Sequence, residues 1–297
     1  LNYTETKMRE IVILSGKGGT GKTLVSASLA AVGAKEAILA DCDVDAANIH
    51  LLLQTKAVKT EVFYSGELAN INQDDCISCG RCMEVCRFDA IGLSNQQYKI
   101  EDAECEGCGY CEKVCPAQAI TLKPRRSGIV YVSDSRLKMP VAHARLDPGA
   151  DNSGKLVAKV KDEARKLARA ENKEYVIIDG APGIGCPVVS SLAGAKYVLF
   201  VTEPTQSALH DLKRLHTLLQ KFKPVTGCII NKNDLNAEMT QEIKLFLKEN
   251  RIELVAELPY SDLFAKSMIG QLTVAEADKQ MFTEFEKIWK KIKERLS

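Results

Sequence analysis

Eight of the eleven cysteines lie in two short runs of identical spacing, and this feature constrains the fold more than any other in the sequence. Each run reads C-x-x-C-x-x-C-x-x-x-C, and the second begins 29 residues after the first. Because the total is odd and most thiols crowd into one segment, the pattern argues against a disulfide scaffold and favours metal binding in a reducing compartment. The first run is Cys76, Cys79, Cys82 and Cys86, and the second is Cys105, Cys108, Cys111 and Cys115.

The spacing of both runs resembles that of bacterial ferredoxins, in which three closely spaced thiolates bind three irons of a cubane. In such folds the fourth cysteine binds the other cluster, so the resemblance implies two [4Fe–4S] clusters with exchanged ligands. Zinc is the rival interpretation, but zinc favours paired C-x-x-C knuckles over two doubled runs. Arg87 stands where the run usually has proline, which removes no ligand. One cluster is expected on Cys76, Cys79, Cys82 and Cys115, and the other on Cys86, Cys105, Cys108 and Cys111.

Short β-branched runs alternate with helical patterns on both sides of the cysteine segment. Residues 10–14 are predicted to form a strand that ends in a glycine-rich stretch, and a helix at 21–33 and a strand at 37–40 follow. Such alternation predicts right-handed crossovers and a doubly wound, mainly parallel α/β sheet. Further strands are predicted at 129–132, 175–178, 197–201, 225–230 and 252–258, with helices at 155–170, at 208–222 and in two C-terminal stretches.

The cysteine segment interrupts this α/β pattern, which resumes after it. We therefore expect a discontinuous α/β domain at residues 1–65 and 125–297. The inserted domain is expected at residues 66–124, as a small α+β fold of the ferredoxin type with two [4Fe–4S] clusters.

Residues 16–23 read G-K-G-G-T-G-K-T and contain the pattern G-x-x-x-x-G-K-[ST]. The pattern lies between a predicted strand and a predicted helix, as a phosphate-binding loop requires. Its glycines allow backbone N–H groups to face a β-phosphate, and the helix N-terminus adds partial positive charge. Lys22 is expected to reach the β- and γ-phosphates, and the Thr23 hydroxyl to complete a Mg²⁺ shell. The expected nucleotide-binding residues of this loop are Gly16, Lys17, Gly18, Gly19, Thr20, Gly21, Lys22 and Thr23.

A lysine directly after the first glycine marks a deviant Walker A loop, and with Lys17 the sequence resembles the MinD/ParA superfamily of P-loop ATPases. The resemblance covers nearly the full length, and with the cysteine runs it is closest to MinD-type ATPases that carry an inserted ferredoxin domain. It implies a homodimer with nucleotide between the subunits, in which Lys17 of one chain touches phosphates held by the other. Lys17 and Lys22 are expected catalytic residues, because ammonium groups offset the charge that develops in phosphoryl transfer.

Acidic residues at the ends of two predicted strands match the switch regions of that superfamily. The resemblance gives Asp43 the role of positioning the attacking water, which makes it the third expected catalytic residue. Asp179 ends a Walker B-like strand and is expected to hold Mg²⁺ through water, because a hard cation prefers carboxylate oxygen. Asp41 and Asp45 flank Asp43 and can equally act as helix caps or surface residues.

Residues 231–234 read N-K-N-D, the N-K-x-D form that recognises guanine in GTPases. The superfamily that the chain resembles mostly uses ATP, with an asparagine at this place contacting adenine. We therefore expect ATP with Mg²⁺ as the nucleotide and Asn231 and Asp234 as base-proximal residues. GTP stays open as the alternative.

Three cysteines lie outside the two runs. Cys186 follows Asp179 by seven residues, where the nitrogenase iron protein of the same superfamily places one of its two cluster cysteines. The second cysteine of that protein has no counterpart here, and the C-P-x-C pair of cluster carriers is also incomplete. We therefore expect Cys186 to be a small buried hydrophobic residue, and Cys42 and Cys228 to lie in the core.

The overall charge and hydropathy exclude several classes of function. With 40 basic and 39 acidic residues the net charge is +1, so we expect no nucleic-acid partner bound through bulk charge. The chain has no apolar run long enough to span a bilayer and no secretory signal is expected, which points to the cytoplasm. The C-terminal helical pattern, with Phe285, Trp289 and Ile292 on one face, is expected to pack on the sheet and not on a membrane. Met8 is a candidate start, downstream of residues 1–7.

Together the motifs predict an ATPase that is coupled, through dimer switching, to electron transfer by two [4Fe–4S] clusters and to an unidentified redox or iron–sulfur partner. Two alternatives stay open. One is an ATPase that assembles or carries iron–sulfur clusters, and the other is a MinD-like positioning ATPase whose clusters sense redox state.

Overall fold

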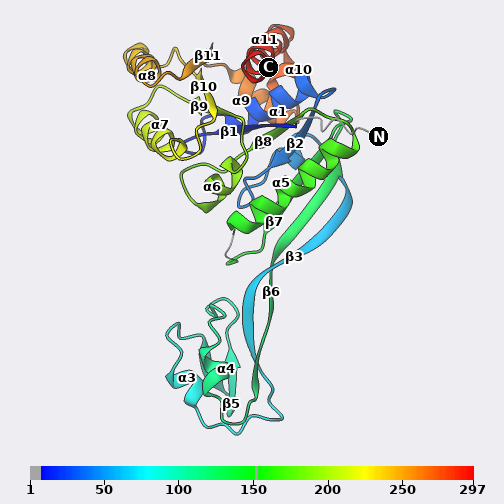
Figure 1. Ribbon diagram of the computed structural model, residues 1–297, viewed down its shortest axis with the longest axis vertical. Coiled ribbons are helices and arrows are strands. Elements are labelled where there is room, and N and C mark those ends of the chain that lie inside the picture. Colours follow the sequence, from blue (N-terminus) through cyan, green and yellow to red (C-terminus); the bar gives the residue numbers. More distant parts are fainter. Residues whose placement is uncertain (1–7, 151–152) are drawn as a thin grey trace. The chain divides into compact units, whose positions relative to one another are not determined.

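The computed structural model describes residues 8–150 and 153–297, so the expectation for residues 1–7 lies outside the described part (Figure 1). The chain divides into two compact units. Of the described residues, the first consists of 8–61, Val130–Arg145 and Ser153–Ser297, and the second of Val62–Ile129 and 146–150. The expected insertion at residues 66–124 lies within the second unit.

One nine-stranded sheet organises the first unit, in the order β11-β10-β9-β1-β8-β2-β7-β6-β3. Its central strands are short, apolar and buried along their length, because helices cover both faces. Strands from β11 to β7 pair in parallel, which confirms the predicted doubly wound α/β sheet. The strands are β1 (Arg9–Leu14), β2 (Ala37–Asp41), β3 (Lys56–Ile71), β6 (Ile120–Asp134), β7 (Pro140–Leu146), β8 (Tyr175–Asp179), β9 (Tyr197–Thr202), β10 (Val225–Asn231) and β11 (Glu253–Leu258).

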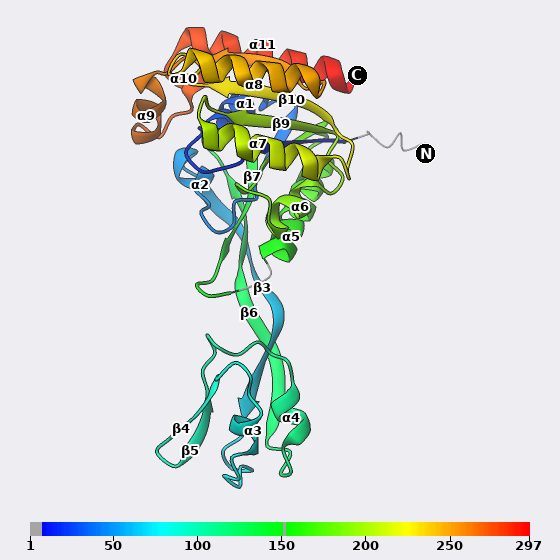
Figure 2. The same ribbon diagram turned by 90° about the vertical axis from the view of Figure 1, so that its left-hand side faces the viewer.

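Helices lie on both faces of this sheet, with α1 and α11 on one side and α5 and α6 on the other (Figure 2). The predicted C-terminal helix packs on the sheet as expected, because Phe285, Trp289 and Ile292 are all buried in the core. Among the described residues, no helix combines the length and the apolar character that crossing a bilayer requires. The helices are α1 (Lys22–Gly33), α2 (Ile49–Leu52), α5 (Ser153–Ala170), α6 (Cys186–Leu192), α7 (Gln206–Leu219), α8 (Ala237–Glu249), α9 (Asp262–Ile269), α10 (Val274–Ala277) and α11 (Lys279–Leu296).

Two long strands differ most from the sequence-based expectation. The predicted strand at 129–132 is the end of the 15-residue β6, and the 16-residue β3 was not predicted. Most residues of β3 are exposed, so the strand lacks the alternation of apolar and polar residues that reveals a half-buried strand. Strand β7 and helix α8 were not predicted either.

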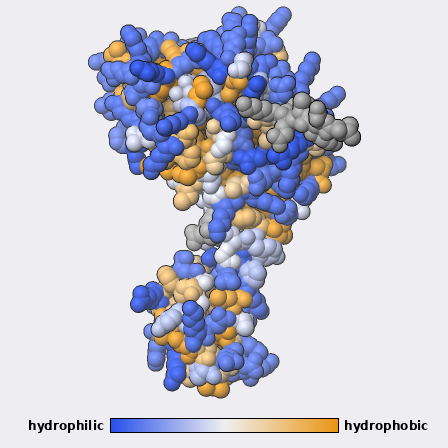
Figure 3. All heavy atoms as spheres, viewed as in Figure 1, coloured by the Kyte–Doolittle hydropathy of each residue, from blue (hydrophilic) through white to orange (hydrophobic). Residues whose placement is uncertain are grey.

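The second unit carries an internal repeat. Helices α3 (Arg81–Glu84) and α4 (Tyr110–Val114) each follow a glycine with a left-handed backbone, Gly80 at φ 78° and Gly109 at φ 72°. Between the helices, β4 (Ile91–Ser94) and β5 (Gln97–Ile100) form an antiparallel hairpin. Figure 3 shows hydrophobic residues interspersed among hydrophilic ones on the visible face of this unit. Its core is small and includes Cys82, Cys105 and Cys111, so the thiols lie where a larger domain would place aliphatic side chains.

Candidate functional site

The glycine-rich loop at residues 16–23 connects β1 to α1 and is open on one side. Gly19 (φ 82°) and Gly21 (φ 91°) have left-handed backbone conformations, which residues other than glycine rarely adopt. A methyl group added at Gly18 or Gly19 would meet no atom within 4 Å, whereas one at Gly16 would collide with Asp211. The Thr20 hydroxyl is buried and has no hydrogen-bond partner among the described residues. An open cradle of N–H groups with an orphaned hydroxyl fits a phosphate chain.

Asp179 is the centre of the polar network beneath this loop. Its side chain is fully buried at the end of β8. Lys22 Nζ donates to Asp179 Oδ1 at 2.8 Å, Thr23 Oγ1 donates to Oδ2 at 2.9 Å, and Ser26 Oγ donates to Oδ1 at 2.7 Å. The structure therefore brings together the three residues predicted for the phosphate and Mg²⁺ sites, Lys22, Thr23 and Asp179. The side-chain oxygens of Thr23 and Asp179 suit a hard cation such as Mg²⁺.

The segment after β2 adds two carboxylates to the network. Asp41 pairs with Asp179 across parallel strands β2 and β8, is fully buried, and accepts hydrogen bonds from the amides of Asp43 (3.1 Å) and Ile49 (3.2 Å). Burial, reinforced by the Asp179 carboxylate, raises the pKa of Asp41 to about 7. Asp43 lies 3.9 Å from Lys22 Nζ, and Asp45 is exposed. Asp41 thus caps the turn that presents Asp43, whereas the sequence alone had left a cap and a surface position equally open for Asp41 and Asp45.

The charge of Lys22 is maintained by these neighbours. Burial alone would lower the pKa of Lys22, but the Asp179, Asp43 and Asp41 carboxylates outweigh this effect and raise it. The ammonium group therefore stays charged between the carboxylates. A triphosphate would compete with these carboxylates for the same cation.

Lys17 contacts a residue that sequence reasoning missed. Its ammonium group lies 2.8 Å from a Glu203 carboxylate oxygen and 3.1 Å from the hydroxyls of Thr205 and Ser207. Burial opposes ionisation of Glu203, but hydrogen bonds from Lys17 and Lys232 outweigh it and lower the pKa of that carboxyl. Glu203 follows β9 directly, and only its position after a strand end could have singled it out. The contact of Lys17 with a partner's phosphates stays a prediction.

The N-K-x-D segment lies against the phosphate loop. Asn231 Nδ2 donates to the Thr20 carbonyl at 2.9 Å, and Lys232 Nζ donates to the Gly19 carbonyl at 3.2 Å and to Glu203 at 2.7 Å. Asp234 Oδ1 accepts a hydrogen bond from the Tyr260 amide. Asn231 therefore supports the loop backbone, and the contacts of Asn231 and Asp234 with a base remain predictions.

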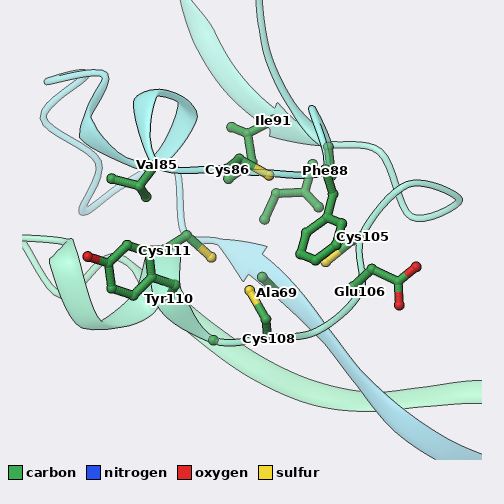
Figure 4. Close-up of a pocket in the computed structure, with 13 residues that line it drawn as sticks. Ala69, Val85, Cys86, Phe88, Ile91, Cys105, Glu106, Cys108, Tyr110 and Cys111 are labelled. Carbon is green, nitrogen blue, oxygen red and sulfur yellow. The ribbon is translucent and has the colours of Figure 1, made fainter.

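The eight clustered cysteines line two separate cavities in the second unit. Figure 4 shows one of them, in which Cys86 approaches Cys105 and Cys108, which precede α4, and Cys111, which lies in α4. The grouping matches the exchange of the fourth ligand between runs that the ferredoxin resemblance implies. The first cavity is lined by Cys86, Cys105, Cys108 and Cys111, and the second by Cys76, Cys79, Cys82 and Cys115.

The number of thiols at each cavity suits a [4Fe–4S] cluster. All eleven cysteines are free, as expected for metal-binding thiols and not for a disulfide scaffold. Across residues 8–150 and 153–297, no three His, Cys, Asp or Glu side chains converge on one ion position. Four thiols line each cavity, and a cubane takes four thiolates, each of which binds a different iron.

Gly107 is where the backbone needs glycine most. It has φ 63°, and a methyl group there would collide with the Glu67 carbonyl on β3. We expect Gly107→Ala to displace the loop between Cys105 and Cys108 and to remove about half of the iron after reconstitution, because one cluster of two is lost. Gly92→Ala is the matched control, since its methyl group would meet nothing within 4 Å. Iron and acid-labile sulfide per chain measure the outcome, and equal iron in both variants would contradict the expectation.

The three other cysteines separate into two environments. Cys42 and Cys228 are fully buried, which confirms their expected place in the core. The expected burial of Cys186 is wrong, because Cys186 is the first residue of α6 and is exposed. The prediction followed from the missing second cluster cysteine, which says nothing about how exposed the start of α6 is.

Comparisons with known proteins agree with both parts of the site. A family model described as a 4Fe-4S dicluster domain matches residues 69–122. The uncharacterized protein MJ0578 of Methanocaldococcus jannaschii is 36% identical over 288 residues, which cover 96% of either chain. The septum site-determining protein MinD of Synechocystis sp. is 25% identical over 252 residues, which cover 84% of this chain and 73% of that protein.

A comparison with solved structures extends the agreement to the fold. The septum site-determining protein MinD from Pyrococcus horikoshii, complexed with Mg-ADP, gives a TM-score of 0.58 at 19% identity and covers 96% of both chains. At this identity the match shows the fold alone. The chain therefore belongs to the same family as the M. jannaschii protein, with a MinD/ParA-like P-loop ATPase fold into which a 4Fe-4S dicluster domain is inserted.

Proposed function

We propose that the protein hydrolyses ATP and that its nucleotide state is coupled to electron transfer through two [4Fe–4S] clusters. The observation that carries this proposal is the presence, in one chain, of a complete phosphate loop with its buried Asp179 and of two cavities lined by four thiols each. Further parts of the proposal are a homodimer, a cytoplasmic location and a redox or iron–sulfur partner protein.

In the nucleotide site each residue has a proposed task. Residues 16–23 would hold the phosphates, with Lys22 moving from Asp179 to the β- and γ-phosphates. Thr23 and Asp179 would then hold Mg²⁺, which supplies charge to the phosphates. Asp43 would orient the attacking water, and Lys17 would act on a nucleotide bound by the partner subunit.

In the insert the cysteines would hold the two clusters, which would supply one-electron carriers when bound. Cys79 and Cys108, one in each cavity, are exposed, so each cavity has a thiol next to solvent. An exposed ligand at each cluster suits the exchange of electrons with other proteins.

The sheet offers a physical route for coupling. Strand β6 begins in the insert and continues into the sheet, where it is separated from β2 only by β7. Strand β2 ends at Asp41, whose position pairs with His143 of β7 on one side and with Asp179 on the other. A shift of these carboxylates with nucleotide would therefore reach the strand that carries the insert.

The test is the hydrolysis rate of anaerobically reconstituted protein in the oxidised and in the dithionite-reduced state, with electron paramagnetic resonance (EPR) spectra recorded with and without ATP. We expect reversible reduction, a rate that depends on redox state, and a spectrum that changes with ATP. Hydrolysis rates that are identical in both states would contradict the coupling. GTP measured alongside ATP decides the base preference that the N-K-x-D segment leaves open.

The same experiment separates two other functions. Loss of iron from the protein on ATP addition would favour a cluster carrier, for which the exposed Cys186 is the one supporting observation. ATP-dependent binding to a membrane or filament that survives loss of all eight clustered cysteines would favour a positioning ATPase, in line with the MinD likeness.

A further inference from the structure

Arg125, near the middle of β6, joins two segments of the second unit through its guanidinium group. Its Nη1 donates to the carbonyl of Cys105 at 3.1 Å, and its Nη2 donates to the carbonyl of Gly149, also at 3.1 Å. Cys105 is one of the proposed cluster ligands, whereas Gly149 lies in the segment that precedes α5. The Arg125 side chain is thus hydrogen-bonded both to the cluster-binding loop, residues 105–111, and to a segment that holds none of the proposed cluster ligands.

The segment around Gly149 is attached to β6 by further contacts. The Asp147 amide donates to the Ser127 carbonyl at 3.0 Å, and Arg126 Nε lies 2.9 Å from the Asp147 carboxylate. The Ala150 amide donates back to the Asp147 carbonyl at 3.0 Å, which closes a turn. This turn, residues 147–150, is therefore held by adjacent arginines, of which only Arg125 also contacts the cluster-binding loop.

The turn leads by chain connection into α5, which begins at Ser153 and is packed against α6. A methyl group added at Gly154 would lie 3.2 Å from Cys186 Cβ, so the helix starts approach each other closely. At the other end of α6, Lys161 donates to the carbonyls of Ser191 and Ala193 at 2.6 Å. Helix α6 in turn begins seven residues after Asp179, the centre of the nucleotide site.

We propose that Arg125 is a positioning residue that transmits the ordering of the cluster-binding loop, residues 105–111, to the turn at residues 147–150 and so to α5. The inference rests on the proposed function and names a residue through which that function is regulated. An arginine suits this role because its planar fork donates to two carbonyls at once, whereas lysine presents a single ammonium centre.

The test measures amide hydrogen exchange in the full chain, before and after anaerobic reconstitution of the clusters. In the unaltered protein we expect loading to slow exchange at residues 105–111 and also at Asp147 and Ala150. The expected slowing at the turn is about tenfold, the scale of one hydrogen bond from a charged donor. In Arg125→Gln the slowing at residues 105–111 should remain, and the slowing at the turn should disappear.

Arg126→Gln is the matched control. It removes the contact with Asp147 and leaves Cys105 untouched, so the turn should exchange faster in both states and keep its response to loading. Arg125→Lys keeps the charge but replaces the two donors of the guanidinium fork by one ammonium centre, so it should give an intermediate response and covers the case in which Arg125→Gln folds poorly. A turn that does not respond to loading in the unaltered protein, or that responds equally in Arg125→Gln, would overturn the inference.

The outcome is separable from that of the proposed function. If loading protects the turn through Arg125 but hydrolysis ignores redox state, the link stands and the coupling to ATP fails. If hydrolysis follows redox state while the turn does not respond, the coupling takes another route and Arg125 has no part in it. Protein that takes up no iron would overturn both.

Discussion

Replacing Cys79 and Cys115 together by serine is expected to leave about half of the iron, whereas replacing Cys108 and Cys115 together is expected to remove nearly all of it. The reason is that Cys115 shares a cavity with Cys79 and not with its sequence neighbour Cys108. The first pair of changes therefore damages one cluster, and the second pair damages both. Iron, acid-labile sulfide and the integrated EPR signal of reduced protein measure the result.

The two double variants also distinguish exchanged ligation from ligation within each run. If each run bound its own cluster, the Cys108 and Cys115 changes would retain half of the iron and the Cys79 and Cys115 changes would lose all of it. Cys186→Ser should keep the full iron content, because Cys186 lines neither cavity. A reversed order of the two double variants would disprove exchanged ligation.

Lys17→Ala is expected to reduce ATP hydrolysis by about 10³-fold or more while nucleotide still binds to the single chain, the scale of a cationic residue supplied in trans in phosphoryl transfer. Lys22→Ala should instead weaken nucleotide binding itself, because Lys22 belongs to the phosphate loop. Its ammonium group is ion-paired with Asp179. Turnover and binding of a fluorescent nucleotide analogue distinguish the two losses.

Lys213→Ala on α7 is the control for removing a lysine near this region, and it should turn over like the unaltered protein. In the single chain Lys17 is held by Glu203, so a partner's phosphate would compete with that carboxylate. Normal turnover in Lys17→Ala would remove the argument that this lysine acts across a dimer.

Features with a local signature could be read from the sequence. The apolar runs of β1, β8 and β9, the glycine spacing of the phosphate loop and the repeat of the two cysteine runs each depend on residues close in the chain. Apart from the strand predicted at 129–132, which is part of the much longer β6, the predicted strand and helix positions of the α/β part agree with the structure to within a few residues. The polar, exposed β3 has no such signature, and it was missed.

Features that depend on contacts between distant segments were decided by the tertiary structure. The distinction between Asp41 and Asp45 follows from the pairing of β2 with β8, which buries Asp41 beside Asp179 and leaves Asp45 exposed. The partnership of Lys17 with Glu203 joins the loop after β1 to the end of β9. The exposure of Cys186 likewise depends on which way the start of α6 faces.

By itself the amino-acid sequence determined that this chain combines a phosphate loop on an α/β sheet with an insertion bearing two sets of thiols, because spacing along the chain encodes both. Only the tertiary structure decided what surrounds them: the ion pair of Lys17, the burial of Asp41 beside Asp179 and the bridge of Arg125 between Cys105 and Gly149. These contacts join residues far apart in the chain, and a single polar residue carries no periodic pattern that names its partner.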